Sequence, residues 1–413
     1  MPQRTAGVAF AVLLLTACDQ LGAVAKPEVP LWVNHPGTAL SVDARRELSA
    51  KQLDAGEPYE RAVPAIDPAH RRVFVGSSDR GMYALSAATL ATVWRFETGG
   101  AVQGEPLYSQ AEDALYFGSN DGAVYKLRAA DGAMQWRFAT NSEVLRKPVQ
   151  SGNTLFVMNA NDTLVAIDKD KGTLRWFRQR TPAFGMEVAG YAGPTIHDGL
   201  VYTAFSDGAV MAYRIEDGSE AWPAIADLTA EAEQSSGGTE FRYLDVDTTP
   251  VVAHVAGEAM LLVASYEGGV FALDPKTGGQ LWRNEKATGV TELTLWTGPT
   301  RQAQASSGAA HPGVLVASSG LTGLWGIKPS DGSAIWRREL PAGGATAAVA
   351  WAGALLVGTS RYGMFLMHPL DGSVLDGVAS GGSFGATPAA YGRHAFALTN
   401  DGTVLALGIE PPQ

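Results

Sequence analysis

Residues 118–136, GSNDGAVYKLRAADGAMQW, decide the fold of this chain. They combine a glycine turn, an apolar segment in which Val124 and Tyr125 fall on opposite faces, an Asp-Gly pair and a tryptophan. Alternation of this kind is typical of a half-buried strand, and Asp-Gly pairs supply the positive φ of tight hairpin turns. The stretch therefore predicts antiparallel strands joined by tight turns.

The same pattern recurs along the chain at the intervals of propeller blades. Six copies end in a tryptophan, and the spacings between these tryptophans are 42, 40, 46, 60 and 54 residues. A seventh copy has Asp376 at this position, and an eighth, TNDGTVLALG, stops near the C-terminus. Four-stranded blades repeat about every 40–50 residues. We predict an all-β fold, an eight-bladed β-propeller of four-stranded antiparallel blades, in which each tryptophan packs blade against blade. The tryptophans are Trp94, Trp136, Trp176, Trp222, Trp282 and Trp336.

The eighth copy is too short for a whole blade, so its missing strand is sought at the other end of the chain. The segment PLWVNHP, around Trp32, is the candidate for an N-terminal strand that closes the ring. Closure of this kind leaves no long unpaired edge, and the propeller is expected to span residues 31–413. Three segments fall outside the repeat and are expected to be long loops, the first with a short helix. They are residues 39–60, 223–243 and 286–312.

The N-terminus predicts export and a lipid anchor. Residues 1–17 combine one arginine, an apolar run and small residues, which is the pattern of a signal peptide. The apolar run is too short to span a bilayer as a helix. Leu-Thr-Ala ahead of Cys18 resembles a bacterial lipobox, which implies that Cys18 is lipidated and that residues 18–30 are a tether. Several acyl chains hold a protein stably on a membrane surface.

Composition excludes several classes of function. The formal net charge of −11 argues against nucleic-acid binding, whose electrostatic footprint is basic. Cys18 is the single cysteine, which excludes an internal disulfide and any cysteine-rich zinc or c-type haem site. The seven histidines lack metal-ligand spacing. We therefore predict no catalytic, cofactor or metal site.

The candidate functional residues are two aspartates in FRYLDVDTTPVV, residues 241–252. Asp245 and Asp247 share one face of an extended chain, a geometry that fits a metal site, a catalytic pair or a partner surface. Buried together, two carboxylates would raise each other's pKa, so we expect them near solvent, ready for an arginine or lysine of a partner. Capping of local turns by their side chains is the alternative.

The lipobox, the tether, eight quinoprotein-type repeats and the string DVDTTPVV together resemble the BamB family, lipoproteins of the outer-membrane β-barrel assembly machine. The resemblance implies a non-enzymatic scaffold, monomeric within a hetero-complex, that supports insertion of β-barrel proteins. Its implied partners are the periplasmic domains of the central barrel subunit, with unfolded outer-membrane proteins as further candidates. It also implies that Asp245 and Asp247 lie on the docking surface, and that the protein faces the periplasm from the outer membrane.

The chain departs from the family pattern in two places. The second docking loop matches FGMEVAGYAGPT, in which Met186 and Val188 keep an apolar pair and Ala189 stands where the family has an arginine. Another cation, Arg178 or Arg180, would have to replace it. Asp19, directly after Cys18, favours retention at the inner membrane in the best-known sorting systems. Both departures favour an alternative, a propeller scaffold for a different envelope complex.

An enzymatic alternative follows from the same repeat. Quinoprotein repeats also build pyrroloquinoline-quinone dehydrogenases, which typically hold their cofactor under a vicinal disulfide and beside a calcium ion. A chain with one cysteine cannot form that disulfide. We therefore expect no cofactor.

Overall fold

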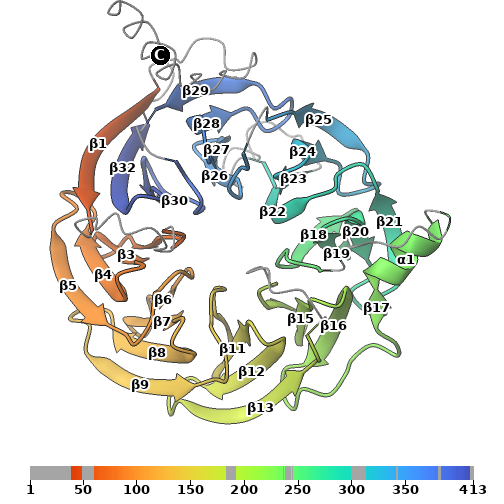
Figure 1. Cartoon of the computed structure of the whole chain (residues 1–413), viewed down its shortest axis with the longest axis horizontal. Coiled ribbons are helices and arrows are strands. Elements are labelled where there is room, and N and C mark those ends of the chain that lie inside the picture. The colour runs from red at the N-terminus through yellow and green to blue at the C-terminus, as the bar shows by residue number, and fades with distance from the viewer. Residues whose placement is uncertain are drawn as a thin grey trace, which may run out of the picture.

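The computed structural model describes residues 39–48, 60–182, 192–235, 237, 243, 245–298, 313–340, 343–379 and 383–409. Within these ranges the strands form eight four-stranded antiparallel sheets, which confirms the predicted blades. Figure 1 shows the sheets arranged as a ring around one axis. No helix in this part of the chain is long and apolar enough to cross a membrane.

Each blade runs outward from the axis in four strands. The innermost strands are β2 (Ala65–Asp67), β6 (Leu107–Ser109), β10 (Val149–Ser151), β14 (Thr195–His197), β18 (Val251–Val255), β22 (Val290–Trp296), β26 (Val349–Trp351) and β30 (Ala389–Tyr391). The second strands are β3 (Arg72–Gly76), β7 (Ala114–Gly118), β11 (Thr154–Asn159), β15 (Leu200–Ala204), β19 (Glu258–Ser265), β23 (Val314–Ser319), β27 (Ala354–Thr359) and β31 (His394–Leu398). The third strands are β4 (Gly81–Ser86), β8 (Ala123–Arg128), β12 (Thr163–Asp168), β16 (Ala209–Arg214), β20 (Gly269–Leu273), β24 (Gly323–Ile327), β28 (Gly363–Met367) and β32 (Thr403–Ile409).

The outermost strands form the rim of the ring in Figure 1. They are β5 (Thr92–Glu97), β9 (Met134–Ala139), β13 (Thr173–Gln179), β17 (Ala226–Asp227), β21 (Gln280–Asn284), β25 (Ala334–Arg338), β29 (Val374–Val378) and β1 (Leu40–Glu47). Blade 1 is β2–β5 and the count continues along the chain to blade 8, which is β30–β32 with β1. The helix α1 (Leu228–Ser235) follows the outermost strand of blade 4.

The hydrophobic core lies between the blades, on both faces of each sheet. All five residues of β7, and the first five residues of β8, are buried. The alternation in this stretch predicts strands buried on one face, but a neighbouring blade covers each face of the sheet. The outermost strands, such as β9, combine exposed positions with a buried tryptophan or its counterpart.

One contact between neighbouring blades repeats around the ring. Each of the six repeat tryptophans donates its indole N–H to a main-chain oxygen of the following blade, at 2.8–3.0 Å. The ring of Trp94, for example, packs on Gly132, which has a φ of 74° and belongs to the Asp-Gly turn of the next blade. A Cβ added to Gly132 would lie 2.8 Å from that indole. The tryptophan and the Asp-Gly turn are therefore two halves of one contact, and the predicted blade packing is confirmed.

The junction between blade 8 and blade 1 uses a different pair of residues. Ala44 of β1 occupies the position of Trp94, since both pair with an alanine of the third strand beside a bulge. In the facing hairpin, Leu90 stands where blade 2 has Gly132, and it keeps a left-handed φ of 58°. Leu90 is fully buried in the cluster against which Ala44 packs. At this junction the hairpin supplies the large residue and the outermost strand the small one, which reverses the arrangement between blades 1 and 2.

The strand that completes blade 8 is β1, so the predicted closure is confirmed but its position is corrected. Leu40 pairs with Ile409 and Glu47 pairs with Thr403. Trp32, the predicted closing residue, lies outside the described residues. The short helix predicted after residue 39 is wrong where the structure describes the segment, because LSVDARRE alternates half-buried and exposed positions with the period of a strand.

The other two segments predicted to be loops also contain strands of the repeat. Residues 223–243 include β17 and the helix α1, and residues 286–312 include β22, the innermost strand of blade 6. The sequence pattern missed them because it follows the turn, third strand and tryptophan of each blade. The innermost strand β22 lies outside that pattern, and β17, the outermost strand of blade 4, is only two residues long and follows Trp222.

Asp376 replaces the tryptophan at the junction between blade 7 and blade 8. Its side chain is buried, and its two carboxylate oxygens accept hydrogen bonds from the N–H of Leu40 and of Gly377, both at 2.7 Å. The following blade presents the start of β1 here, which offers a main-chain donor instead of a carbonyl. An acceptor side chain therefore takes the place of the indole donor.

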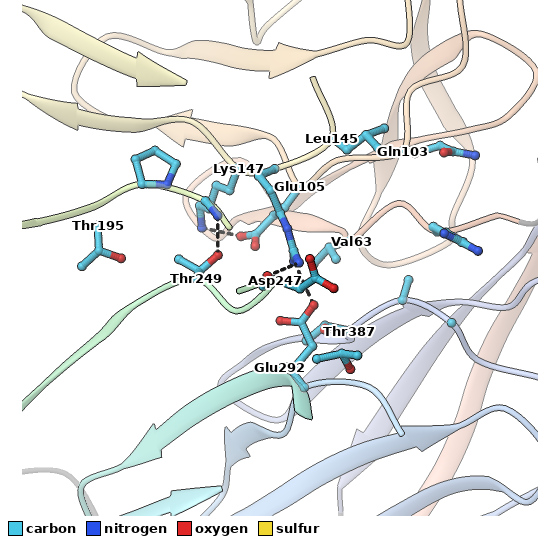
Figure 2. A pocket seen from close by; sticks show the side chains of 18 of the residues that line it. Val63, Gln103, Glu105, Leu145, Lys147, Thr195, Asp247, Thr249, Glu292 and Thr387 are labelled. Atoms are coloured by element: carbon cyan, nitrogen blue, oxygen red, sulfur yellow. Dashed lines mark hydrogen bonds and ion pairs between the residues drawn. The ribbon is translucent and has the colours of Figure 1, made fainter. Parts of the chain in front are cut away.

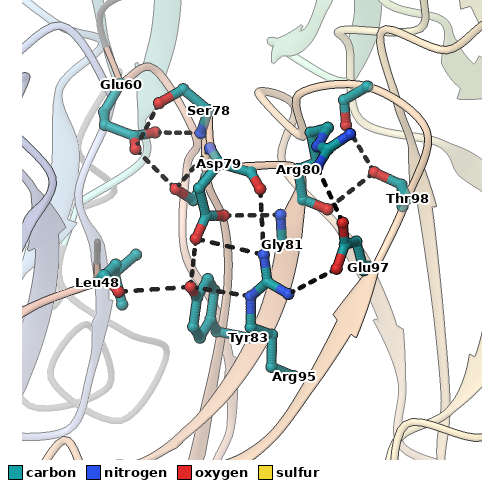
Figure 3. Close-up of polar contacts among 12 residues, drawn as sticks. Leu48, Glu60, Ser78, Asp79, Arg80, Gly81, Tyr83, Arg95, Glu97 and Thr98 are labelled. Carbon is teal, nitrogen blue, oxygen red and sulfur yellow. Dashed lines mark hydrogen bonds and ion pairs between the residues drawn. The ribbon is translucent and has the colours of Figure 1, made fainter. Parts of the chain in front are cut away.

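A polar network holds Glu60, at the entry to blade 1, against the turn between β3 and β4 (Figure 3). The carboxylate of Glu60 accepts from the main-chain N–H of Ser78 at 2.8 Å and from its hydroxyl at 2.9 Å. Burial raises the pKa of Glu60, and these hydrogen bonds oppose that rise. The next residue, Asp79, accepts from the Tyr83 hydroxyl at 2.5 Å, and Arg95 donates to the Tyr83 oxygen at 3.0 Å. These contacts anchor Glu60 to blade 1.

The substitution Asp376→Ala tests the closing junction. Because it leaves the half-buried N–H of Leu40 without its acceptor, we expect a loss of about 1–3 kcal/mol in the free energy of unfolding and a lower melting temperature. Asp376→Asn keeps one acceptor oxygen but turns an amide donor toward the other main-chain N–H, so its stability should fall between that of the native protein and that of Asp376→Ala. Thermal and urea denaturation measure both variants, with Glu216→Ala as a control that removes one exposed carboxylate. An Asp376→Ala variant as stable as this control would contradict the proposed role of the carboxylate.

Candidate functional site

A cavity of about 1380 Å³ lies on the axis of the ring, and its lining residues come from all eight blades. Most of them lie on the loops that enter the innermost strands, or at the first residues of those strands. Figure 2 looks into this cavity, with Asp247 and Glu292 near its centre. Asp245 also lines it, so the structure brings the two predicted aspartates into one cavity.

The segment that carries the aspartates is an extended loop ahead of β18, held on both sides by main-chain hydrogen bonds. The Val246 N–H donates to the oxygen of Phe205 at 3.4 Å, and the Tyr266 N–H donates to the oxygen of Asp245 at 3.1 Å. Val246 is buried in the core between blades 4 and 5. Because successive side chains of an extended segment point to opposite sides, burial of Val246 directs its two neighbours into the cavity.

The residues after the pair shape the loop. The hydroxyl of Thr248 accepts from the Ala264 N–H at 2.8 Å, and that of Thr249 accepts from the Gly193 N–H at 2.9 Å. The Thr195 hydroxyl donates to the oxygen of Pro250 at 2.5 Å. The sequence TTP therefore ties the loop of blade 5 to blade 4.

The expectation that the two aspartates lie near solvent is wrong. Asp245 is 6% exposed and Asp247 is 7% exposed. Their carboxyl groups lie within hydrogen-bonding reach of each other, and Oδ1 of Asp245 has no hydrogen-bond partner among the described residues. Burial first, and the neighbouring Asp245 second, raise the pKa of Asp247 to about 8. The sequence could not show this burial, because the cavity walls come from distant blades.

A single arginine links the loops on the floor of the cavity. Arg146, on the loop ahead of β10, donates to Oε1 of Glu292 at 2.8 Å and to the main-chain oxygen of Asp247 at 2.8 Å. Figure 2 shows both contacts as dashed lines that end at Glu292 and Asp247. Its charge lowers the pKa of Asp247, but less than burial and Asp245 raise it. The floor therefore combines three carboxyl groups with one guanidinium.

The wall around the aspartates carries apolar and aromatic groups. The rings of Tyr243 and Tyr266 meet edge to face, with centroids 5.8 Å apart, and both residues line the cavity. Leu321 lines it as well and is 62% exposed. Across the cavity, Lys147 forms an ion pair with Glu105. An acidic floor beside aromatic and apolar walls is suited to a long cationic side chain.

The remaining predicted site residues lie either outside the described residues or away from this cavity. Cys18, Met186 and Val188 lie outside the described residues, as do Asp19 and Ala189. Arg180 forms an ion pair with Asp207 at 2.5 Å. Arg178 donates to the main-chain oxygens of Phe177 and Asp217. Neither arginine lines the cavity, so neither replaces the missing docking arginine there.

One cluster with metal-ligand chemistry was not predicted, since its members come from two blades. Ligand atoms of Asp67, His70 and Asp113 lie within 4.8 Å of one another, which no other group of three such residues does in the described ranges. Arg72 lies between the carboxylates, donating to Asp67 at 2.8 Å and to Asp113 at 2.6 Å. A guanidinium already fills the place of a cation, so we assign the cluster to the junction of blades 1 and 2.

Similarity to known proteins extends over most of the propeller. The family model for outer membrane protein assembly factor BamB matches residues 79–300 and 267–410. A relative of that name from Legionella pneumophila is 26% identical over 220 residues, which are 53% of this chain and 50% of the relative. Polyvinylalcohol dehydrogenase from a Pseudomonas species is 25% identical over 330 residues, which cover 68% of this chain and 46% of that protein. The chain thus spans about half the length of these relatives. The crystal structure of BamB from Moraxella catarrhalis matches with a TM-score of 0.68 and 19% identity, covering 90% of this chain and 100% of that one.

The raised pKa of Asp247 predicts how stability depends on pH. The pKa is about 8 in the folded protein against an ordinary 3.8, so the folded state holds a proton that the unfolded state releases. This contribution is complete below about pH 4 and is lost as the pH rises toward about 8. Asp247→Asn removes the ionisation, so its melting temperature should fall less between pH 5 and 8 than that of the native protein. Scanning calorimetry measures both curves.

The control for this prediction is Asp131→Asn. Asp131 is exposed, and its hydrogen bond from Arg128 lowers its pKa to about 2, outside the window. The control curve should therefore run parallel to the native curve between pH 5 and 8. Parallel curves for Asp247→Asn as well would show that Asp247 ionises normally.

Proposed function

Because the chain belongs to the family of outer membrane protein assembly factor BamB, we propose that it is a non-enzymatic scaffold subunit of the outer-membrane β-barrel assembly machine. In this role it binds the periplasmic domains of the central barrel subunit and thereby supports insertion of β-barrel proteins. The observation that carries the proposal is the family match, which runs through most of the propeller. Unfolded outer-membrane proteins are further candidate partners.

The axial cavity is the proposed docking site for the central subunit. Its floor has the carboxyl groups of Asp245, Asp247 and Glu292, and Arg146 supplies one positive charge against them. Buried carboxylates without full charge compensation favour a cation from outside. Since both aspartates are nearly buried, only a long side chain such as arginine or lysine reaches them. The partner therefore inserts a side chain, instead of lying flat on an acidic surface.

Met186 and Val188 are proposed as apolar contacts at the edge of the same site. Their loop connects β13 to β14, and the residues that follow it, from Gly193 to Ile196, line the cavity. With Ala189 in place of the family's arginine, this loop contributes apolar contact without charge. The aspartates then carry the electrostatic part of the recognition.

The anchor of the scaffold is proposed to be the lipidated Cys18. Residues 18–30 would form its tether, ahead of the first strand at Leu40. We place the protein at the outer membrane, facing the periplasm, as a monomer within the hetero-complex. Asp19 supports inner-membrane retention as the alternative, and with it a different envelope complex.

A second candidate function is a quinone-dependent dehydrogenase, favoured by the similarity to polyvinylalcohol dehydrogenase. The residues do not fit the group that such enzymes hold. A single cysteine cannot form a vicinal disulfide. Among the described residues, no three carboxylate or histidine ligand atoms of the cavity lie close enough together to hold a calcium ion. We derive no reaction from this likeness.

The docking proposal predicts the behaviour of a double variant. Asp245→Ala with Asp247→Ala should abolish recovery of the central barrel subunit from gently solubilised envelopes, because loss of a buried charge contact costs about 2–5 kcal/mol in binding. The matched control, Asp131→Ala with Asp217→Ala, removes two exposed aspartates and should bind like the native protein.

A companion variant separates docking from folding. Asp245→Asn with Asp247→Asn keeps the size of both side chains, and thermal melting reports whether the propeller is intact. Recovery of the central subunit by a folded Asn variant at native yield would argue against the aspartates as the docking site. If the native protein recovers no such subunit, the scaffold serves another complex.

The dehydrogenase candidate has its own test. Purified protein incubated with pyrroloquinoline quinone and calcium is expected to reduce no artificial electron acceptor with alcohol substrates, because its residues do not fit that cofactor. The measurement is dye reduction followed by absorbance, beside a known quinoprotein. Reduction that requires the quinone would favour the enzyme.

A further inference from the structure

Asp245 and Asp247 are neighbouring buried acids that line one cavity. Two ionised carboxylates offer only acceptors, so the contact between Asp245 and Asp247 is a hydrogen bond only if one of them is protonated. Both are more than nine-tenths buried, and Oδ1 of Asp245 is without a partner in the described part of the chain. Like charges this close in a buried site cannot both ionise readily.

The other ionisable groups around the pair favour retention of that proton. Glu292 adds a further negative charge, and the charge of Arg146 is shared between Glu292 and the main chain of Asp247. Tyr243, Tyr266 and Glu267 also line the cavity. Burial and the aspartates raise the pKa of Tyr266, so its hydroxyl stays neutral at physiological pH. Arg146 is one cation beside four acids, Asp245, Asp247, Glu267 and Glu292, which leaves room for a proton.

We infer that Asp245 and Asp247 share one proton in the free protein, and that entry of a single guanidinium or ammonium group of the partner expels it. This inference rests on the proposed docking function and adds the chemistry of its ligand. The open cavity that both aspartates line is the place for the incoming donor.

The charges balance in this exchange. The free pair carries one negative charge and one proton. The occupied pair carries two negative charges and faces one positive group, while the proton passes to the solvent. The net charge of the site is unchanged, so the cavity never holds two uncompensated carboxylates. Docking then becomes tighter as the pH rises, by up to about tenfold per pH unit below the upper titration of the pair.

Calorimetry of docking tests the inference directly. The full chain in detergent is titrated with the isolated periplasmic domains of the central barrel subunit at about pH 6.5, in two buffers of different ionisation enthalpy. We expect release of about one proton per complex from the native protein and from the control Asp131→Asn. Asp247→Asn should release none. Binding without proton release in the native protein would overturn the inference and leave the docking proposal intact.

A measurement on the free protein keeps the inference testable if those domains do not bind, an outcome that would overturn the proposed function. Carbon-13 labelling of the aspartate carboxyl groups follows their ionisation by nuclear magnetic resonance. One carboxyl should titrate far above the others, and Asp247→Asn should remove that titration. If every aspartate of the native protein ionises at its ordinary pH, the shared proton does not exist.

Discussion

The contact between an indole and the glycine turn of the next blade is the interaction on which this structure depends. A four-stranded sheet with both faces apolar is not stable by itself, so each blade needs a neighbour on either side. Trp94 and its counterparts bury one face, and their N–H groups each find one carbonyl across the junction. The turn accepts the ring only because Gly132 and its counterparts lack a Cβ. Repetition of this contact fixes the spacing of blades and, through it, the width of the axial cavity.

The ring closes at the two junctions where the tryptophan-glycine contact is absent. The first and last described strands, β1 and β32, meet in blade 8, and the junctions on its two sides are the ones without a tryptophan-glycine pair. At the junction with blade 1, Leu90 supplies the large side chain and Ala44 the small one. On the other side of blade 8, Asp376 binds the first N–H of the closing strand. Side-chain packing joins blade 8 to blade 1, where two formed strands meet. The carboxylate of Asp376 joins blade 7 to blade 8, where it accepts from the first N–H of a strand.

The sequence predicted the blades well because tryptophans and Asp-Gly turns are local signals that recur. The closing strand was misplaced because the charges in LSVDARRE hide an alternation that only pairing with β32 makes evident. Burial of Asp245 and Asp247 could not be predicted, since it is imposed by Arg146, Glu292 and Tyr266 from other loops. Two aspartates in an exposed loop and two at the bottom of a cavity have the same local sequence. Their chemistry differs because burial decides whether they hold a proton.

The pairing of β1 with β32 also sets the order in which this molecule can form. Leu40 is made long before its partner Ile409, so β1 must wait until every blade of the ring has been made. Contacts so distant in sequence slow folding, because the entropy of a very large loop is lost before the pairing repays it. Until then the other blades form an open arc with an uncovered apolar face at each end. The finished ring has no such faces, but a chain interrupted before its last strand would keep both, and with them a strong tendency to aggregate.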